Sequence, residues 1–282
     1  MFDYFVYDVF TDVAFGGNQL AVFPDARDIP ESLLQSIAAE FNFSEVTFIY
    51  PPEDPAHTAR VRIFTPTSEV DFAGHPTIGT LIALTDLGYS SPMVLELGVG
   101  PLHCDIKDGR ASFTATQSLE TFAEPETAFM AELLGLTEAQ ICTTTHQPIQ
   151  ASLGLPFAFV ELESTAALAA CLPKTDSFRE GAKLYPVSLD FAVFAYVRRG
   201  GQIRSRMFAP LDNIPEDPAT GSASATLAAL LTKLLNMPQN LMFTQGFEMG
   251  RTSTIFAKTT ENPITVTVSG QAVKTMQGTF IL

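Results

Sequence analysis

Two short motifs in the chain each place a titratable residue before a proline, with a glycine four residues after it. The first is His75-Pro-Thr-Ile-Gly-Thr80, and the second is Asp217-Pro-Ala-Thr-Gly-Ser222. Imidazole and carboxylate groups are common general acids and bases in enzymes. Either motif alone is explained by a helix cap after a turn. The repetition, with a titratable residue at the same place, favours a functional interpretation that involves proton transfer.

Each motif predicts a helix that begins at its proline, Pro76 or Pro218, because proline is favoured in the first helical position. The unpaired N–H groups and the dipole at a helix start attract an anion. Gly74, just before the first motif, and Gly221 with Ser222 in the second, would let a ligand approach the backbone closely. Two such helix starts facing one another would hold a small carboxylate.

A third proton-transfer candidate is Glu45, which lies near the start of an apolar strand predicted within Asn42–Tyr50. Taken alone, this segment favours an ordinary polar residue at a strand end. Beside two anion-binding helix starts, Glu45 completes a set suited to removing a proton next to a carboxylate. Asn18 follows Gly16-Gly17 and is either a turn former or a ligand contact.

The motifs lie in longer stretches that also align, Arg62–Thr80 and Arg206–Thr226. His75 and Asp217 are 142 residues apart, about half of the 282-residue chain, as expected for a duplicated domain. The acidic, proline-containing segment Gln117–Thr127 is the predicted connection. The domain division is therefore 1–117 for the N-terminal domain and 128–270 for the C-terminal domain.

The helices predicted after the motifs, Thr77–Leu87 and Ala219–Leu235, carry one charge each. A helix that is apolar nearly all round must be buried on most sides. Many short strands are predicted around both helices from runs of apolar residues bounded by turn residues. The predicted fold class is α+β, with two similar domains that each wrap a curled mixed sheet around a central helix.

Composition excludes several functions. The net charge of −15 argues against binding nucleic acid. No uncharged apolar run is long enough for a membrane span, and Asp3 and Asp8 within the first apolar run argue against a signal peptide. Three cysteines without metal-ligand spacing indicate a reducing compartment, so a cytoplasmic protein is expected. No zinc, nucleotide or serine-hydrolase motif occurs, so neither a metal nor a cofactor is predicted.

The chain resembles the PhzF family, the phenazine biosynthesis-like proteins of the diaminopimelate epimerase superfamily. The resemblance covers nearly the whole chain. It rests on Gly16-Gly17-Asn18 with Ala21-Val22-Phe23, on Ser44-Glu45-Val46-Thr47-Phe48, on Phe72-Ala73-Gly74-His75-Pro76-Thr77, and on Glu216-Asp217-Pro218-Ala219-Thr220-Gly221-Ser222-Ala223. The chain departs from the usual family form at Gln19 and Pro76, which bears on the shape of the substrate.

The resemblance implies a diaminopimelate epimerase-like fold, an active site in the cleft between the domains, and a C-terminal strand (271–282) that returns to the first domain. It also implies that Glu45 shuttles the proton and that His75 and Asp217 are its polar partners. The substrate contacts implied by the motifs or proposed from the residues are Ser44, Gly74, Gly221, Ser222 and Asn18. A homodimer is suggested by the resemblance alone.

The predicted function is therefore a cofactor-independent isomerase that moves a proton within a small carboxylic acid. One alternative is a lyase that dehydrates a hydroxy acid through the same carbanion. The other is a metabolite-binding protein that has kept the fold and lost the chemistry. A racemase that uses two thiols is disfavoured, because all three cysteines lie outside both motifs.

Overall fold

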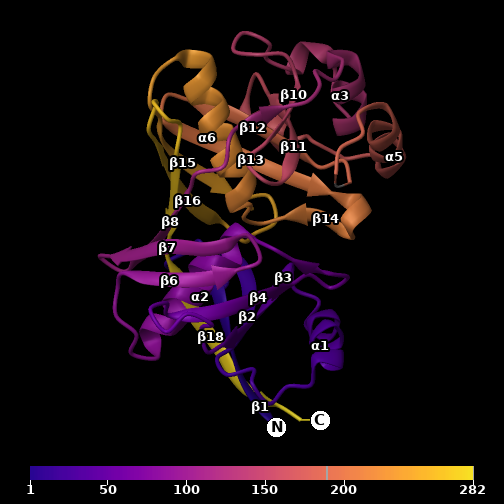
Figure 1. Cartoon of the computed structure of the whole chain (residues 1–282). Helices are drawn as coiled ribbons and strands as arrows, with labels where there is room; N and C mark the ends of the chain where they lie inside the picture. Colours follow the sequence, from indigo (N-terminus) through magenta and orange to yellow (C-terminus); the bar gives the residue numbers. More distant parts are fainter. Residues whose placement is uncertain (189, 282) are drawn as a thin grey trace. The chain divides into compact units, whose positions relative to one another are not determined.

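The structure is a computed structural model that describes residues 1–188 and 190–281. Contacts between Cα atoms divide the chain into two compact units (Figure 1). Unit 1 comprises Met1–Thr114 and Val268–Leu282, and unit 2 comprises Ala115–Thr267. None of the described helices has the length and apolar character needed to cross a lipid bilayer.

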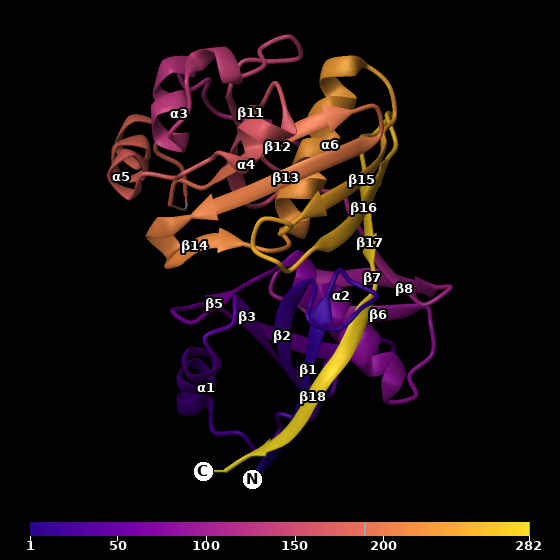
Figure 2. The ribbon, with the colours of Figure 1, turned by 180° about the vertical axis from the view of Figure 1, so that it is seen from behind.

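Unit 1 is a mixed sheet that packs on helix α2 (Gly74–Asp86), with α1 (Leu34–Phe41) and a 3-10 turn (Glu31–Leu33) between the second and third strands (Figure 2). Its strands are β1 (Phe2–Val9), β2 (Asn18–Phe23), β3 (Glu45–Tyr50), β4 (Ala59–Phe64), β5 (Glu69–Val70), β6 (Met93–Leu97), β7 (Gly100–Lys107), β8 (Arg110–Ala115) and β18 (Ala272–Phe280). The last of these, β18, pairs antiparallel with β1 along its length, with Phe2 opposite Phe280. The two ends of the chain therefore lie in the same sheet.

Unit 2 is a second mixed sheet that packs on helix α6 (Gly221–Leu235). Its strands are β9 (Glu120–Thr121), β10 (Ile149–Ser152), β11 (Pro156–Glu161), β12 (Val193–Arg199), β13 (Gln202–Ala209), β14 (Ile214–Asp217), β15 (Asn240–Gln245) and β16 (Ser253–Thr259), and β17 (Val266–Gly270) crosses the unit boundary. Its other helical segments are α3 (Thr127–Leu134), α4 (Thr165–Ala169), α5 (Thr175–Leu184), and 3-10 turns at Glu138–Gln140 and Pro210–Asp212.

The two sheets repeat one pairing order. In unit 1, β1–β2, β3–β4 and β6–β7 are antiparallel, whereas β2–β3 and β4–β6 are parallel. In unit 2, β10–β11, β12–β13 and β15–β16 are antiparallel, whereas β11–β12 and β13–β15 are parallel. Strands β1 to β4 thus correspond to β10 to β13, α2 corresponds to α6, and β6 corresponds to β15. The predicted α+β class, with a similar sheet and central helix in each half, is confirmed.

Both central helices are buried on nearly every side, as their composition predicts. Ten of the thirteen residues of α2 and eleven of the fifteen residues of α6 are buried. Close packing on the sheet requires Gly79 in α2, because a Cβ atom there would lie 2.5 Å from Leu20 Cδ2. Buried hydroxyls in α2 are satisfied locally, since Thr77 donates to the Ala73 carbonyl and Thr80 to Thr47 Oγ1.

The prediction that each helix begins at the motif proline was wrong for both. Helix α2 begins at Gly74, so Pro76 is its third residue and lacks only an N–H that would have no partner within the helix. Helix α6 begins at Gly221, and Pro218 lies before it. The two motifs align in sequence, yet His75 lies inside its helix and Asp217 lies outside, at the end of β14.

Candidate active site

Unit 1 brings together the predicted site residues from its half of the chain. Parallel strands β2 and β3 place Leu20 opposite Glu45, so Asn18 and Ser44 lie at the same end of the sheet. Ser44 Oγ donates to Asn18 Oδ1 over 3.3 Å. His75, the second residue of α2 after Gly74, places its Nδ1 3.2 Å from Glu45 Oε2. This arrangement couples a carboxylate to an imidazole at a helix start.

The His75 ring is held in its neutral form. Its side chain is 4% exposed, and burial lowers the pKa of His75 to about 3, although a hydrogen bond with the Gln19 backbone acts in the opposite direction. Its Nε2 atom has no hydrogen-bond partner among the residues that the structure describes. Near neutral pH the Glu45 carboxylate therefore faces an uncharged ring, and it is not locked in an ion pair with an imidazolium.

The turn before β2 depends on a glycine. Gly17 has φ +59°, and a Cβ atom there would lie 2.2 Å from the Val9 carbonyl oxygen. Only glycine fits this close approach, which delivers Asn18 to the first position of β2. The loop is also held by Asp8, whose buried carboxylate accepts a hydrogen bond from the Phe15 N–H at 2.7 Å. Asp8 was not among the predicted site residues.

Unit 2 holds Asp217 at the end of β14 with a 5% exposed surface. Thr220, the residue before α6, donates from Oγ1 to Asp217 Oδ2 over 2.5 Å. The next two residues, Gly221 and Ser222, open the helix and carry its first N–H groups. The Asp217 carboxylate, the Thr220 hydroxyl and the start of α6 therefore form one polar group within unit 2.

An arginine brace fixes the strand that carries Asp217. Arg206 on β13 is 8% exposed and donates from Nε and Nη2 to both oxygens of Glu216, at 2.8 and 2.7 Å. Its Nη1 also donates to the carbonyl oxygens of Leu168 and Cys171. In the sequence, Arg206 stands out only as the first residue of the repeated stretch Arg206–Thr226. Its repetition as Arg62 was the available signal for a structural role.

Two of the three cysteines, Cys104 and Cys171, do not suit acid/base catalysis. Burial raises the pKa of Cys104 and of Cys171 to about 12, so both stay protonated near neutral pH. Groups of His, Cys, Asp or Glu able to hold a metal ion are absent from the described residues. The protonated state of these two thiols agrees with a site built on carboxylate and imidazole groups.

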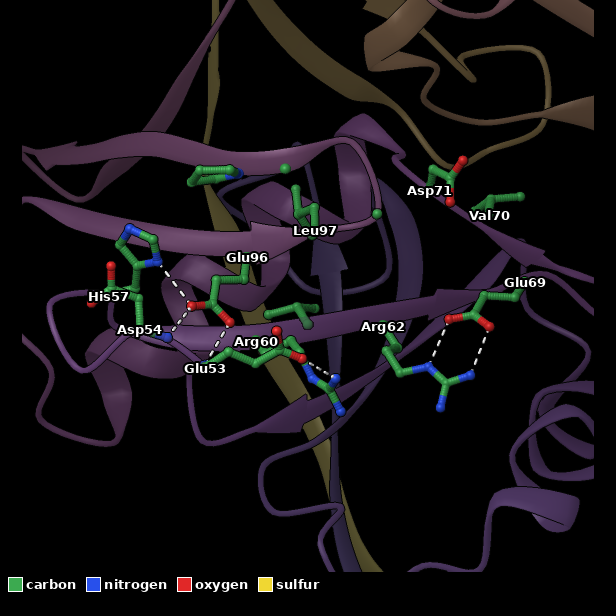
Figure 3. A pocket seen from close by; sticks show the side chains of 14 residues that line it. Glu53, Asp54, His57, Arg60, Arg62, Glu69, Val70, Asp71, Glu96 and Leu97 are labelled. Carbon is green, nitrogen blue, oxygen red and sulfur yellow. Dashed lines mark hydrogen bonds and ion pairs between the residues drawn. The ribbon is translucent and has the colours of Figure 1, made fainter.

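Unit 1 also contains a cavity of about 510 Å³ (Figure 3). Glu96 there accepts hydrogen bonds from the backbone N–H groups of Glu53 and Asp54, both at 2.8 Å, and its Oε1 lies 2.8 Å from His57 Nδ1. The two backbone hydrogen bonds, followed by that of His57, lower the pKa of Glu96 to about 2. Figure 3 also shows Arg62 facing Glu69. These charged side chains pair with one another, so we interpret them as stabilising the sheet around the cavity. No predicted site residue lines the cavity.

The duplicated sheet and helix are shared with a class of epimerases. The chain superposes on a hydroxyproline epimerase from Agrobacterium vitis with a TM-score of 0.63 and 14% identity, covering 99% of this chain and 90% of that one. It superposes better on a PhzF-family phenazine biosynthesis protein from Bacillus anthracis, with a TM-score of 0.87, 22% identity, and coverage of 100% and 99%.

The family model described as phenazine biosynthesis-like protein matches residues 7–278, and the chain belongs to this family. It is 36% identical to the trans-2,3-dihydro-3-hydroxyanthranilate isomerase of Pseudomonas aeruginosa, over 99% of both chains. It is 35% identical to the enzyme of that name from Pseudomonas fluorescens, over the full length of both, and 33% identical to an uncharacterized isomerase of Mesorhizobium japonicum, over 99% of both. The chain is a PhzF-type isomerase, as the sequence motifs predict.

Proposed function

We propose that this isomerase moves a proton within a small carboxylic acid without a cofactor, with Glu45 as the acid/base. The observation that carries the proposal is the 3.2 Å approach of Glu45 Oε2 to a buried, neutral His75. A base must be free to accept a proton and then return it. An imidazolium partner would hold the carboxylate in its charged form, whereas a neutral ring leaves it able to cycle.

In this proposal, Asp217 and His75 orient the substrate or protonate it. The first N–H groups of α2 and α6, at Gly74, Gly221 and Ser222, bind the substrate carboxylate and the charge that develops after deprotonation. Asn18 and Ser44 are proposed as further substrate contacts. Both groups of residues are proposed to act on the same substrate molecule.

The relatives named above point to the first substrate to test, trans-2,3-dihydro-3-hydroxyanthranilate. The purified protein is incubated with this acid in deuterated water, and the product is followed by absorbance, NMR and mass spectrometry. The proposal expects an isomer that has gained deuterium at the carbon that receives the proton. A product lighter by one water would favour the lyase alternative, and binding without turnover would favour a metabolite-binding protein.

Glu45→Gln tests the assignment of the base. The variant keeps the size and hydrogen-bonding capacity of the side chain and removes its ability to take a proton. Turnover and deuterium exchange are expected to fall to background while the circular dichroism spectrum and melting temperature stay near those of the wild type. The matched control is Glu40→Gln, on the exposed surface of α1, which should leave the rate unchanged. A Glu45→Gln enzyme that exchanges deuterium at the normal rate would refute the assignment.

We also propose a homodimer in the cytoplasm, which rests on the family resemblance and the three free cysteines. Light scattering coupled to gel filtration tests the oligomeric state, and a single peak at the mass of one chain would contradict it.

A further inference from the structure

Gln245, the last residue of β15, uses its whole side-chain amide to hold the polypeptide around Asp217. The residue is 0% exposed. Its Nε2 donates to the Asp217 carbonyl oxygen and to Thr220 Oγ1, both at 2.8 Å. Its Oε1 accepts from the Thr220 N–H at 3.1 Å. The donors and the acceptor of the amide are therefore all engaged by the segment that carries Asp217.

These contacts determine where the Thr220 hydroxyl donates. Because Thr220 Oγ1 accepts a hydrogen from Gln245, its own proton is available to Asp217 Oδ2, 2.5 Å away. A hydrogen bond to a carboxylate is short and strong, and a donor that is itself polarised by a neighbour strengthens it further. Gln245 thus sets both the backbone at Asp217 and the direction of the hydroxyl that contacts its carboxylate.

The residues after Gln245 also contact the turn that follows Asp217. Gly246 has φ +71°, and a Cβ atom there would lie 2.8 Å from the Pro218 carbonyl oxygen and 2.4 Å from that of Arg251. Ser253 Oγ donates to the same Pro218 oxygen at 2.7 Å and is fully buried. The turn between Asp217 and α6 is therefore clamped by the segment from Gln245 to Ser253.

Unit 1 has an equivalent of Gln245, and comparing the two positions shows whether the repeated fold itself requires a glutamine there. Strand β15 pairs with β13 so that Ser205 lies opposite Gln245, and β6 pairs with β4 in the same direction, with Arg60 opposite Glu96. Because Arg62 of the repeated motif corresponds to Arg206, the position that corresponds to Gln245 is Leu97. Leu97 is an apolar residue with 8% exposure. The repeated fold therefore accommodates a leucine at this position, and the glutamine occurs in unit 2, which contains Asp217.

We propose that Gln245 is a positioning residue, which acts through Thr220 to hold the Asp217 carboxylate in its reactive geometry. This inference rests on the proposed function, in which Asp217 contacts the substrate. Gln245 itself is fully buried and is not proposed to touch the substrate.

Kinetics of Gln245→Leu test the proposal. The variant is expected to lower kcat about 100-fold, because a small displacement of a catalytic group costs that much. KM should change less than about threefold if substrate binding relies on other contacts. The matched control is Gln150→Leu, a second buried glutamine of unit 2, whose Nε2 donates to the Tyr185 carbonyl. It should lower the melting temperature and leave kcat near the wild-type value.

Substitutions at Thr220 test the same connection and do not depend on whether Gln245→Leu folds. Thr220→Val removes the hydroxyl and should reproduce the loss in kcat, whereas Thr220→Ser keeps it and should retain kcat within about threefold. A kcat that tracks only the loss of stability across these variants would overturn the proposal. So would a Gln245→Leu enzyme with normal kcat.

An NMR measurement separates a failure of this inference from a failure of the proposed function. The Thr220 hydroxyl proton should exchange slowly and be visible in the wild type, and it should disappear in Thr220→Val and in Gln245→Leu. Persistence in Gln245→Leu would overturn the inference even in an active enzyme. If the resonance is visible in the wild type and lost in a folded Gln245→Leu variant, but the wild type turns over no test acid, the contact is supported and the proposed function is contradicted.

Discussion

The two units use the same brace at the strand before their central helices. In unit 1, Arg62 donates to both oxygens of Glu69 at 2.7 Å and lies 5.2 Å from the centre of the Phe64 ring. In unit 2, Arg206 donates to both oxygens of Glu216 and lies 4.9 Å from the Phe208 ring. In each unit, the arginine of an Arg-x-Phe sequence binds a glutamate on the short strand that follows, Glu69 on β5 or Glu216 on β14. The duplication has preserved the device that supports each helix start.

What differs between the units is the chemistry placed on this common frame. Val46 on β3 pairs with Ala21 on β2, and the equivalent residue of unit 2 is Val193 on β12, which pairs with Ala158 on β11. The residue before Val46 is the acid Glu45, whereas the residue before Val193 is Ala192. His75 lies in the first turn of α2, and Asp217 precedes α6. The comparison teaches that the framework is symmetric and the reactive groups are not. Under the proposed function, this difference supplies one base and distinct partners, as expected when a substrate is deprotonated at one atom and reprotonated at another.

Asp217→Asn is expected to have the largest effect on this comparison. The substitution removes the negative charge of the Asp217 carboxylate and keeps a side-chain oxygen that can accept the hydrogen bond from Thr220. Loss of a general acid or an orienting carboxylate should lower kcat by roughly 10² to 10⁴. The free energy of unfolding should change by only about 1 kcal/mol, because the hydrogen bond remains. Initial rates and urea unfolding measure both quantities.

The control for that prediction is Asp176→Asn, since the Asp176 side chain is 95% exposed on α5. It should match the wild type in rate and stability. An Asp217→Asn enzyme that works at the wild-type rate would show that the second unit contributes a helix start and no reacting group.

The two braces provide the next test, which concerns stability. Arg206 is 8% exposed and also donates to backbone carbonyls, whereas the Arg62 side chain is 21% exposed. Arg206→Leu should lower the free energy of unfolding by about 4 kcal/mol, because it leaves Glu216 and those carbonyls without their donor in a buried setting. Arg62→Leu should cost about 1 kcal/mol, since its partners Glu31 and Glu69 are largely exposed. Equal losses in guanidinium unfolding would contradict the difference in burial.

Much of the frame could be predicted from the sequence, because it depends on local signals. Apolar runs bounded by turn residues predict many short strands around both central helices, and the structure has them. The low charge of α2 and α6 predicted their burial. Helix α5 was missed because only Phe178 and Gly181 of its ten residues are buried, so most of the segment is polar and its apolar face is narrow.

The parts that could not be predicted depend on long-range contacts. Gln245 is 28 residues from Asp217. The alternation of β15 puts it on the same buried face as Leu241 and Phe243, but no local pattern indicates which distant residues its amide contacts. The helix starts were misplaced for a similar reason. The residues from Asp217 to Thr220 are held outside α6 by Gln245 and Ser253, whereas the proline rule considers only local preference. The site residues themselves came from the repeat and the family resemblance, and their roles stay predictions.

The remaining prediction concerns the charge state of His75, on which the proposed role of Glu45 depends. In the unfolded chain this histidine takes up a proton below its ordinary pKa of about 6.5, whereas burial lowers the pKa of His75 in the folded protein to about 3. The unfolded state then binds more protons, so the neutral ring stabilises the fold fully above pH 6.5 and progressively less as the pH falls toward 3. Between pH 7 and pH 5 this contribution should fall by about 2 kcal/mol.

His75→Gln should therefore reduce the loss of stability between pH 7 and pH 5 by about 2 kcal/mol, measured by urea unfolding at both values. Burial also lowers the pKa of His146, but this residue is present in both proteins and its effect cancels in the difference. The lowered pKa of Glu96, about 2, acts only below the ordinary range of a glutamate and so outside this interval. If wild type and variant lose the same stability, the pKa of His75 in the folded protein is close to its ordinary value of about 6.5. The ring would then gain a proton as the pH falls from 7 to 5, and Glu45 would face a cation at the lower end of that range.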